Sequence, residues 1–267
     1  MSLTFTILGC GSSMGVPRVA LGWGACDPNN PKNRRRRCAL LVERAGPGGV
    51  TRVLVDCTPD LREQLLDAEV DWLDGVLFTH EHADHTHGVD DLRPLFVHKR
   101  RRVDVYLDDP TSQAMRARFG YCFTTPPGSE YPPILTEHRL SPGQPVTLEG
   151  QGGPIDVLPV LQEHGDITSL GFRFGNIAYS ADIKGLPAES IAAMAGLDVW
   201  IVDALRKSPH PSHFNLDEAL QWIARIKPKR AILTNLHTDM DYAELRTQLP
   251  PGVEPAYDGM QLTDVAS

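Results

Sequence analysis

The stretch His80-Glu81-His82-Ala83-Asp84-His85 follows closely on the apolar run Val76-Leu77-Phe78. Imidazole nitrogens and carboxylate oxygens are the donors that hold zinc and similar divalent metals in proteins. A lone histidine is more often a satisfied structural residue than a ligand, but three histidines and an aspartate lie within these six residues, without Lys or Arg among them. Because open α/β sheets place ligands beyond the carboxyl ends of their strands, we expect a metal site here.

Four side chains can begin to bind a pair of metal ions, but they cannot complete the coordination spheres of both. Further ligands have to come from other parts of the chain. His164, Asp182 and His237 each come shortly after an apolar run that resembles a strand. Taken singly, each of them is as compatible with a surface residue, or with a residue that orients a ligand, as with a metal ligand. Their shared position after a strand favours reading the three together as further metal ligands.

The rest of the chain alternates short apolar runs with segments of helical spacing. Strands are expected at residues 3–8, 38–43, 51–56, 75–78, 103–107, 155–160, 169–174, 176–180, 199–202 and 231–233. Helices are expected at residues 60–68, 109–119, 187–195, 215–226 and 242–249. Strands that precede helices in both halves predict two sheets sandwiched between helices, and residues 1–267 are expected to form a single domain. The proline-rich stretch 121–133 is expected to be a lid or a packed surface loop.

Composition places the chain among ordinary globular proteins, with 267 residues, 41% of them hydrophobic and 22% charged. No stretch approaches the roughly 18 apolar residues that span a bilayer, so no membrane partner is expected. The N-terminus runs directly into a strand-like segment without a basic leader or apolar signal core. Five cysteines at irregular spacing do not suggest a disulfide framework: Cys10, Cys26, Cys38, Cys57 and Cys122. We therefore expect a cytoplasmic protein.

The formal net charge of −8 argues against a broad nucleic-acid footprint. Two basic runs, Arg34–Arg37 and Lys99–Arg102, point the other way. Both runs are explained by solvated charges in loops, and the functional alternative is that they contact a phosphate-bearing substrate. The sequence is compatible with both interpretations, and it does not exclude a nucleic-acid partner.

Through the histidine cluster and the three later residues, the chain resembles the metallo-β-lactamase superfamily hydrolases. Their signature is an HxHxDH cluster followed by His, Asp and His at strand ends. The match runs through His80, His82, Asp84, His85, His164, Asp182 and His237, with Asp56 in a strand before the cluster. The resemblance implies an α/β fold of four αββα layers with a dinuclear metal site at one edge. It implies one ion on His80, His82 and His164 and another on Asp84, His85 and His237. Asp182 would bridge the two ions, which are expected to be Zn²⁺ or Mn²⁺.

Within the superfamily the chain is most similar to the cyclic phosphodiesterases associated with carbon–phosphorus lyase pathways, and more distantly to the tRNA 3′-processing endonucleases. The segments Gly9–Pro17, Trp23–Cys26 and Ser212–Leu216 carry this resemblance. In both families a histidine just ahead of a helix is thought to protonate the leaving group. The resemblance therefore gives this role to His213, with His210 as the reserve. The alternative is that His213 is only a residue beside a helix cap.

The resemblance implies a phosphodiesterase that hydrolyses a small cyclic or nucleotide-like phosphate ester by attack of a hydroxide shared by two metal ions. Asp84 is then counted as catalytic as well as a ligand, together with His213. Asp56 is expected to orient a ligand histidine. Ser12 and Ser13, in the glycine-rich loop, are expected to contact the anionic substrate, although a tight turn explains the glycines equally well.

Two departures from the family pattern limit the identification. The cyclic phosphodiesterases often hold a further structural zinc, but here only Cys26 remains of the cysteine cluster and Met240 stands where a histidine is expected. No third metal is therefore expected. The chain also lacks the glycine- and proline-rich arm with which the tRNA enzymes grip their substrate, which argues against an endonuclease.

Other functions remain as alternatives. One is a carboxylic-ester hydrolase of the same superfamily, such as a lactonase, a thioesterase or a β-lactamase. Another is a tRNA 3′-processing type endoribonuclease, and a third is a non-catalytic protein that binds metal or nucleic acid. The expected partner is a small phosphate-ester substrate, and a homodimer follows from the resemblance only.

Overall fold

The structure is a computed structural model that describes residues 2–263. Two seven-stranded sheets make up its centre. The strands of the first sheet, in chain order, are β1 Leu3–Gly9, β2 Ala39–Gly46, β3 Gly49–Val55, β4 Gly75–Leu77, β5 Val103–Leu107, β6 Leu135–Arg139 and β14 Met260–Thr263. Those of the second are β7 Val146–Leu148, β8 Ile155–His164, β9 Ile167–Phe174, β10 Ile177–Ser180, β11 Val199–Asp203, β12 Arg230–Thr234 and β13 Val253–Pro255.

Each sheet combines an antiparallel half with a parallel half. The spatial order is β14-β1-β2-β3-β4-β5-β6 in the first sheet and β13-β12-β11-β10-β9-β8-β7 in the second. Strands β3 to β6 pair in parallel in the first sheet, and strands β10 to β13 do so in the second. The chain segments that carry chemistry leave from the carboxyl ends of these parallel strands.

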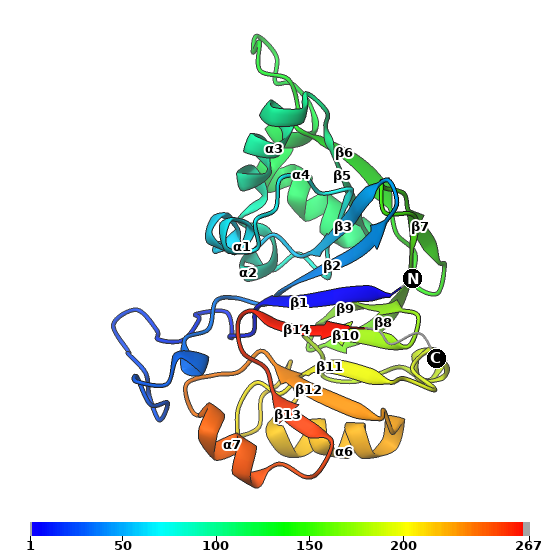
Figure 1. The fold of residues 1–267 in the computed structure, drawn as a ribbon. Helices are drawn as coiled ribbons and strands as arrows, with labels where there is room; N and C mark the ends of the chain where they lie inside the picture. The colour runs from blue at the N-terminus through cyan, green and yellow to red at the C-terminus, as the bar shows by residue number, and fades with distance from the viewer. Residues whose placement is uncertain (1, 264–267) are drawn as a thin grey trace.

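Helices cover the outer face of each sheet, so that the molecule has four layers (Figure 1). In the first half of the chain they are α1 Leu61–Asp67, α2 Ala83–Thr86, α3 Arg93–Lys99 and α4 Asp109–Phe123, with short 3₁₀ turns at Pro31–Asn33 and Val89–Leu92. In the second half they are α5 Ala188–Ala193, α6 Leu216–Ile226 and α7 Tyr242–Gln248. Figure 1 shows α1, α3 and α4 on the side of the first sheet and α6 and α7 on the side of the second.

The central strands are apolar on both faces because both faces are covered. In β2, Leu40 and Val42 belong to the apolar cluster between the two sheets, whereas Ala39 and Leu41 belong to the cluster beneath the first layer of helices. All four side chains are buried. A strand that is buried on both faces appears in sequence as a continuous hydrophobic run rather than as an alternation.

The expected αββα sandwich is confirmed, and the differences concern boundaries and edges. Strand β8 reaches His164, so this histidine is the last residue of a strand instead of following one after a gap. Helix α4 continues to Phe123 and takes up the start of the stretch that was expected to be irregular. Strands β6, β7, β13 and β14 were not predicted, because they are short and lie at or next to the sheet edges, where polar residues weaken the pattern. Within the described residues, no helix combines the length and apolar character needed to cross a bilayer.

Candidate active site

Four side chains from three separate segments form the first candidate ligand group. His80 and His82 lie between β4 and α2, His164 ends β8, and Asp182 follows β10. One donor atom from each lies within 4.8 Å of the others. His164 Nε2 is 3.3 Å from His82 Nδ1 and 3.4 Å from Asp182 Oδ2. Strand ends of both sheets therefore deliver their donors to one point.

The second group shares Asp182 with the first and adds Asp84 and His85. The two carboxylate oxygens of Asp182 face different groups: Oδ2 is 3.6 Å from His80 Nε2, while Oδ1 is 3.3 Å from His85 Nε2. His85 Nε2 is also 3.4 Å from Asp84 Oδ2. Asp182 thus has the position of a bridging carboxylate between two adjacent sites.

Each buried candidate ligand histidine has its Nδ1 held by a hydrogen-bond partner. His85 Nδ1 is 2.7 Å from Asp56 Oδ2, and His164 Nδ1 is 2.7 Å from the carbonyl oxygen of Ser212. His80 Nδ1 is 2.9 Å from Thr79 Oγ1, a hydroxyl that donates to Asp56 Oδ2. Partners of this kind fix the tautomer and aim the other nitrogen at a metal.

The donor set fits divalent metal ions. His80 Nε2 is buried and has no hydrogen-bond partner among the described residues, which is costly unless something else binds it. Burial lowers the pKa of His80 well below its ordinary value, and neighbouring His85 lowers it further, so the neutral, metal-binding imidazole is favoured. Burial acts in the same direction on the pKa of His164, which is also lowered.

His237, the remaining predicted ligand, lies in the same pocket but apart from the second group. It lines the cavity together with Asp84 and Asp182, yet its nitrogens lie outside the set of donors within 4.8 Å of one another. Its Nδ1 is 3.1 Å from Asp239 Oδ1, so the Asp239 carboxylate contacts Nδ1 and not Nε2. A ligand role for His237 therefore stays a prediction.

The cavity over these groups has a volume of about 300 Å³. Its lining includes every predicted substrate contact and further side chains: Ser12, Ser13, Met14, Arg18, His82, Asp84, Asp182, Leu205, Arg206, His210, His213, Asn235 and His237. Ser12 is almost fully buried, and its Oγ has no hydrogen-bond partner among the described residues. An unpaired hydroxyl in a cavity wall is available to a ligand.

His213 lies beside the carboxylate of Asp182. Its Nδ1 is 2.8 Å from Asp203 Oδ2, and its Nε2 is 3.8 Å from Asp182 Oδ2. Burial lowers the pKa of His213, but Asp203 and Asp182 outweigh it and raise that pKa to about 9. Burial also raises the pKa of Asp203, to about 7, although the charge of His213 opposes it. The pair therefore keeps a proton in the pocket.

His210, the predicted reserve acid, has the opposite electrostatic character. Burial first, and then the charge of His213, lower the pKa of His210 to about 4. Its Nδ1 is 3.3 Å from the backbone nitrogen of Ser212, which donates to it. A neutral imidazole that accepts this hydrogen bond is a poorer proton donor than His213.

Four polar residues in the pocket wall or directly behind it were not singled out from the sequence. Asp203 ends β11, as Asp182 follows β10, so its position at the end of an apolar strand was an available signal. Asn235 has a left-handed backbone with φ of 61°, and its Nδ2 donates to Asp182 Oδ1 at 3.1 Å. Arg18 and Arg206 lie in irregular segments, and no local pattern connects either of them to the cluster.

A larger cavity of about 940 Å³ lies near the amino ends of the parallel strands β4 and β5. Several of its charged side chains pair with one another or with a neighbour: Arg52 binds Glu43 and Asp71, and Lys99 lies 3.6 Å from Asp71. No candidate metal group of the described residues falls in its lining. Chemistry, and not size, therefore identifies the smaller cavity as the candidate active site.

Residues 51–235 match the protein family described as the beta-lactamase superfamily domain. The chain belongs to this superfamily, and its αββα fold and buried His/Asp cluster place it among the metallo-β-lactamase-fold, metal-dependent hydrolases. Among solved structures it is similar to a "new diphosphatase from the PhnP family", with a TM-score of 0.87 and 34% identity. That alignment covers 98% of this chain and 97% of the other.

Two curated proteins are also similar. One, named octanoyltransferase, from Porphyromonas gingivalis, is 34% identical over 261 residues, which cover 96% of this chain and 50% of that protein. The other, a ribonuclease Z from Bradyrhizobium diazoefficiens, is 33% identical over 148 residues, or 54% of this chain and 46% of that protein. The chain thus spans about half the length of the first relative, and a name given to the whole of that protein does not assign an activity to the matched half.

Proposed function

We propose that this hydrolase is a two-metal phosphodiesterase acting on a small cyclic or nucleotide-like phosphate ester. The observation that carries the proposal is the pair His213–Asp203, which sets an oriented imidazole 3.8 Å from the bridging carboxylate of Asp182. An alkoxide that leaves phosphorus needs a proton, and an imidazole in this position can supply it. The similarity to a diphosphatase supports chemistry at phosphorus.

In this proposal His80, His82 and His164 would hold one ion, Asp84, His85 and His237 would hold the other, and Asp182 would contribute to both sites. Two such ions, Zn²⁺ or Mn²⁺, would supply Lewis acidity and a hydroxide near neutral pH. Asp56 orients the ring of His85, and Thr79 orients the ring of His80, each through a hydrogen bond with Nδ1. Asn235 fixes the rotation of the Asp182 carboxylate through its 3.1 Å hydrogen bond.

Other residues of the cavity bind the substrate and supply a proton to the leaving oxygen. His213 donates its Nδ1–H to Asp203 Oδ2, so its Nε2 is the atom that gives a proton to the leaving oxygen. Ser12 offers a buried, unpaired hydroxyl to a phosphoryl oxygen. Ser13 and His210 line the same cavity and complete the proposed contacts with the substrate.

A ribonuclease Z-like endonuclease is the second candidate, favoured by the similarity to the Bradyrhizobium protein. The cavity of about 300 Å³ lies at the small end of the range for ligand pockets, which suits a small ester better than a polynucleotide. A carboxylic-ester hydrolase would use the same metal ligands but would have less need of His213. Pre-tRNA, lactones and thioesters are therefore the comparison substrates in a screen of the metal-loaded protein.

We also propose a cytoplasmic location. All five cysteines are free and buried, and none is paired with another. Unpaired thiols are the usual state in a reducing compartment.

The test compares His213→Ala on two diesters whose leaving groups differ. Adenosine 2′,3′-cyclic phosphate expels a ribose alkoxide, and its turnover is expected to fall about 10²–10⁴-fold, the usual contribution of a general acid. Bis(p-nitrophenyl) phosphate expels a nitrophenolate that leaves without help, so its turnover is expected to change little. His138→Ala, an exposed histidine paired with Asp104, is the control. Equal losses on both diesters, or a loaded wild type that turns over lactones but no diester, would overturn the proposal.

A further inference from the structure

A second cavity adjoins the candidate active site at His82. It has a volume of about 590 Å³ and is lined by His82, Ala83, His87, Arg118 and Phe119. His82 also lines the cavity over the candidate metal groups and belongs to the first of those groups. We call this second space the flanking cavity. A substrate whose ester lies at the metal groups can therefore extend past His82 into the flanking cavity.

Two aromatic rings form a corner in the wall of the flanking cavity. Phe119 is partly buried and packs against the apolar cluster beneath the first layer of helices, which anchors its ring. The ring centroids of Phe119 and the exposed His87 are 5.4 Å apart, and the two ring planes meet at 83°. Aromatic rings bind other flat rings by offset stacking or by edge-to-face contact. Two nearly perpendicular rings therefore offer a flat group both kinds of contact.

The end of helix α4 places these side chains beside the ligand segment. Phe119 has φ of −127° and ψ of 34°, values outside the helical range, so the helix is kinked at this residue. Arg118, the residue before it, donates from its Nη1 to the carbonyl oxygen of Glu81, which lies between His80 and His82 in sequence. This contact ties the kinked end of α4 to the segment that carries the candidate metal ligands.

Hydrogen-bonding groups stand next to the aromatic corner. A guanidinium has five N–H donors, and the bond from Arg118 to Glu81 leaves most of them for a ligand. The ring nitrogens of His87 can donate or accept a hydrogen bond. A flat ligand with heteroatoms in its ring fits this wall better than a flexible chain, because both its face and its edge find partners.

We propose that the flanking cavity binds the nucleobase of the substrate, with Phe119 as the stacking surface and Arg118 and His87 as hydrogen-bond partners of the base. The inference rests on the proposed function, since the base is placed by the phosphate ester bound at the metal groups. It narrows the substrate class from a small phosphate ester to a nucleoside phosphate ester. Every nucleobase has a π face, so stacking favours the presence of a base without selecting among bases.

Two ligands that differ only in the base measure its contribution. Adenosine 3′-monophosphate and methyl β-D-ribofuranoside 3-phosphate carry the same sugar and phosphate, and only the first has a base. Calorimetry on the metal-loaded protein gives both dissociation constants without turnover. The adenosine ligand is expected to bind about 10- to 100-fold more tightly, the range that base–aromatic stacking provides.

Substitutions at Phe119 separate stacking from packing. Phe119→Leu is expected to remove most of the advantage of the adenosine ligand, because leucine still packs against the apolar cluster but has no aromatic face. Phe119→Trp is expected to keep the advantage. Both variants are expected to bind the riboside phosphate as the wild type does, which verifies that the phosphate site is intact.

Two further variants complete the test. Arg118→Met is expected to weaken binding of the adenosine ligand alone, by about 3- to 10-fold, as for the loss of one hydrogen bond. Tyr131→Leu is the matched control, because Tyr131 is 78% exposed and lines a different cavity. It is expected to leave both dissociation constants unchanged.

The inference is overturned if the wild type binds the two ligands equally tightly, or if Phe119→Leu keeps the full advantage. It is equally overturned if Tyr131→Leu loses the advantage to the same extent, since a general loss of aromatic surface would then explain it. Failure of the proposed function has a different signature: the loaded wild type would not hydrolyse bis(p-nitrophenyl) phosphate. Because binding is measured without turnover, the two failures are distinguishable.

Discussion

At the scale of single residues, Asp182 is the group on which both candidate metal subsites depend. It is almost fully buried, and His80, His85 and His164 all approach its carboxylate within 3.3–3.6 Å. A carboxylate in this position has to be balanced by positive charge, because burial of an isolated ion is expensive. Metal ions at the two subsites would supply that charge.

Asp56 is expected to act on metal affinity through His85. Asp56→Asn would remove the anionic acceptor that holds His85 Nδ1 at 2.7 Å and would no longer select its tautomer. Loss of such a partner typically weakens metal binding by about 10–100-fold. Competition with a chelating dye measures the affinity. Asp71→Asn, which removes an exposed carboxylate far from the site, is the control, and unchanged affinity in Asp56→Asn would contradict this role.

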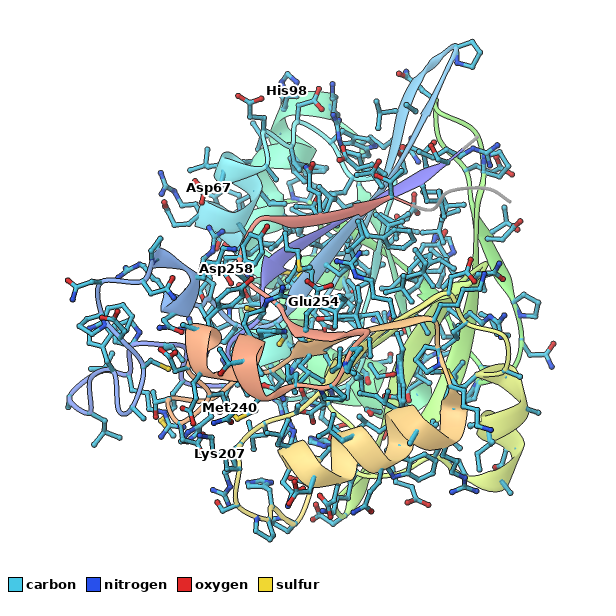
Figure 2. All side chains as sticks on the ribbon, turned by 60° about the horizontal axis from the view of Figure 1, so that its bottom comes forward. Asp67, His98, Lys207, Met240, Glu254 and Asp258 are labelled. Atoms are coloured by element: carbon cyan, nitrogen blue, oxygen red, sulfur yellow. The ribbon has the colours of Figure 1, made fainter. Side chains whose placement is uncertain are left out.

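Asp258 is expected to make stability depend on pH. Asp258, labelled in Figure 2, lies 3.2 Å from the Arg36 guanidinium. Its burial outweighs this ion pair and raises its pKa to about 6. The folded protein therefore keeps this proton up to a higher pH than the unfolded chain, whose carboxyl titrates near the ordinary value. Stability from this group is full below about pH 4 and falls by about 3 kcal/mol as the pH rises to about 6.

Urea unfolding of the wild type and Asp258→Asn between pH 4 and 7 measures this effect. The wild type is expected to lose stability relative to the variant across that window and to show no further change above it. Asp67→Asn is the control, because Asp67 pairs with the same Arg36 but is 67% exposed. A stability difference between wild type and Asp258→Asn that stays constant with pH would contradict the burial argument.

At the scale of elements, the first loop is held against the segment that carries His237. Arg35 in this loop is only 2% exposed, and its guanidinium donates to the carbonyl oxygens of Met240 at 2.8 Å and His237 at 3.4 Å. It also contacts Cys26 Sγ at 3.9 Å. In Figure 2, Met240 lies beside this loop and helix α7. A buried cation thus joins two segments that are distant in sequence.

Arg35→Met is expected to destabilise the fold by about 1–3 kcal/mol, since it leaves buried carbonyl oxygens without donors. The free energy of unfolding in urea measures this loss. Arg35→Lys, which restores one cationic donor, is expected to recover part of it. The exposed neighbour provides the control, and an effect of Arg34→Met equal to that of Arg35→Met would refute the role of the buried contacts.

The elements also show why some of the site could be predicted and some could not. The cluster from His80 to His85 is local, so its residue types and spacing were sufficient. His164 and Asp182 required only the rule that ligands gather at strand ends, and the structure brings them to the cluster. The positions of Arg18 and Arg206 in the cavity wall could not be predicted, because only the tertiary structure brings a loop hairpin and the segment after β11 together there.

At the scale of the whole molecule, the site exists only where the two sheets meet. The first sheet supplies His80, His82, Asp84 and His85, and the second supplies His164 and Asp182. The apolar cluster between the sheets, with Phe5, Leu40, Phe172 and Tyr179 among its members, fixes their relative position. The αββα layering was predictable because apolar strands precede helices in both halves of the chain and because of the family resemblance, whereas the short edge strands lacked a clear apolar pattern.

Metal ions are expected to stabilise this arrangement as well as to support turnover. Ions that bind the folded but not the unfolded chain stabilise the folded state by mass action. Chelator treatment is therefore expected to lower the melting temperature, and Zn²⁺ or Mn²⁺ to restore it. Asp182→Asn is expected to show a much smaller response to the ions. A melting temperature that does not respond to metal in the wild type would contradict ligation by the two groups.

The most direct test of a two-metal phosphodiesterase is a metal titration of the chelator-treated protein, with turnover of adenosine 2′,3′-cyclic phosphate and bound metal per chain measured in the same samples. The account predicts no turnover without metal, a maximum when two ions are bound per chain, and no comparable recovery in Asp182→Asn. Turnover by the metal-free protein, a maximum at a single bound ion, or a fully loaded wild type that leaves the diester intact would contradict it.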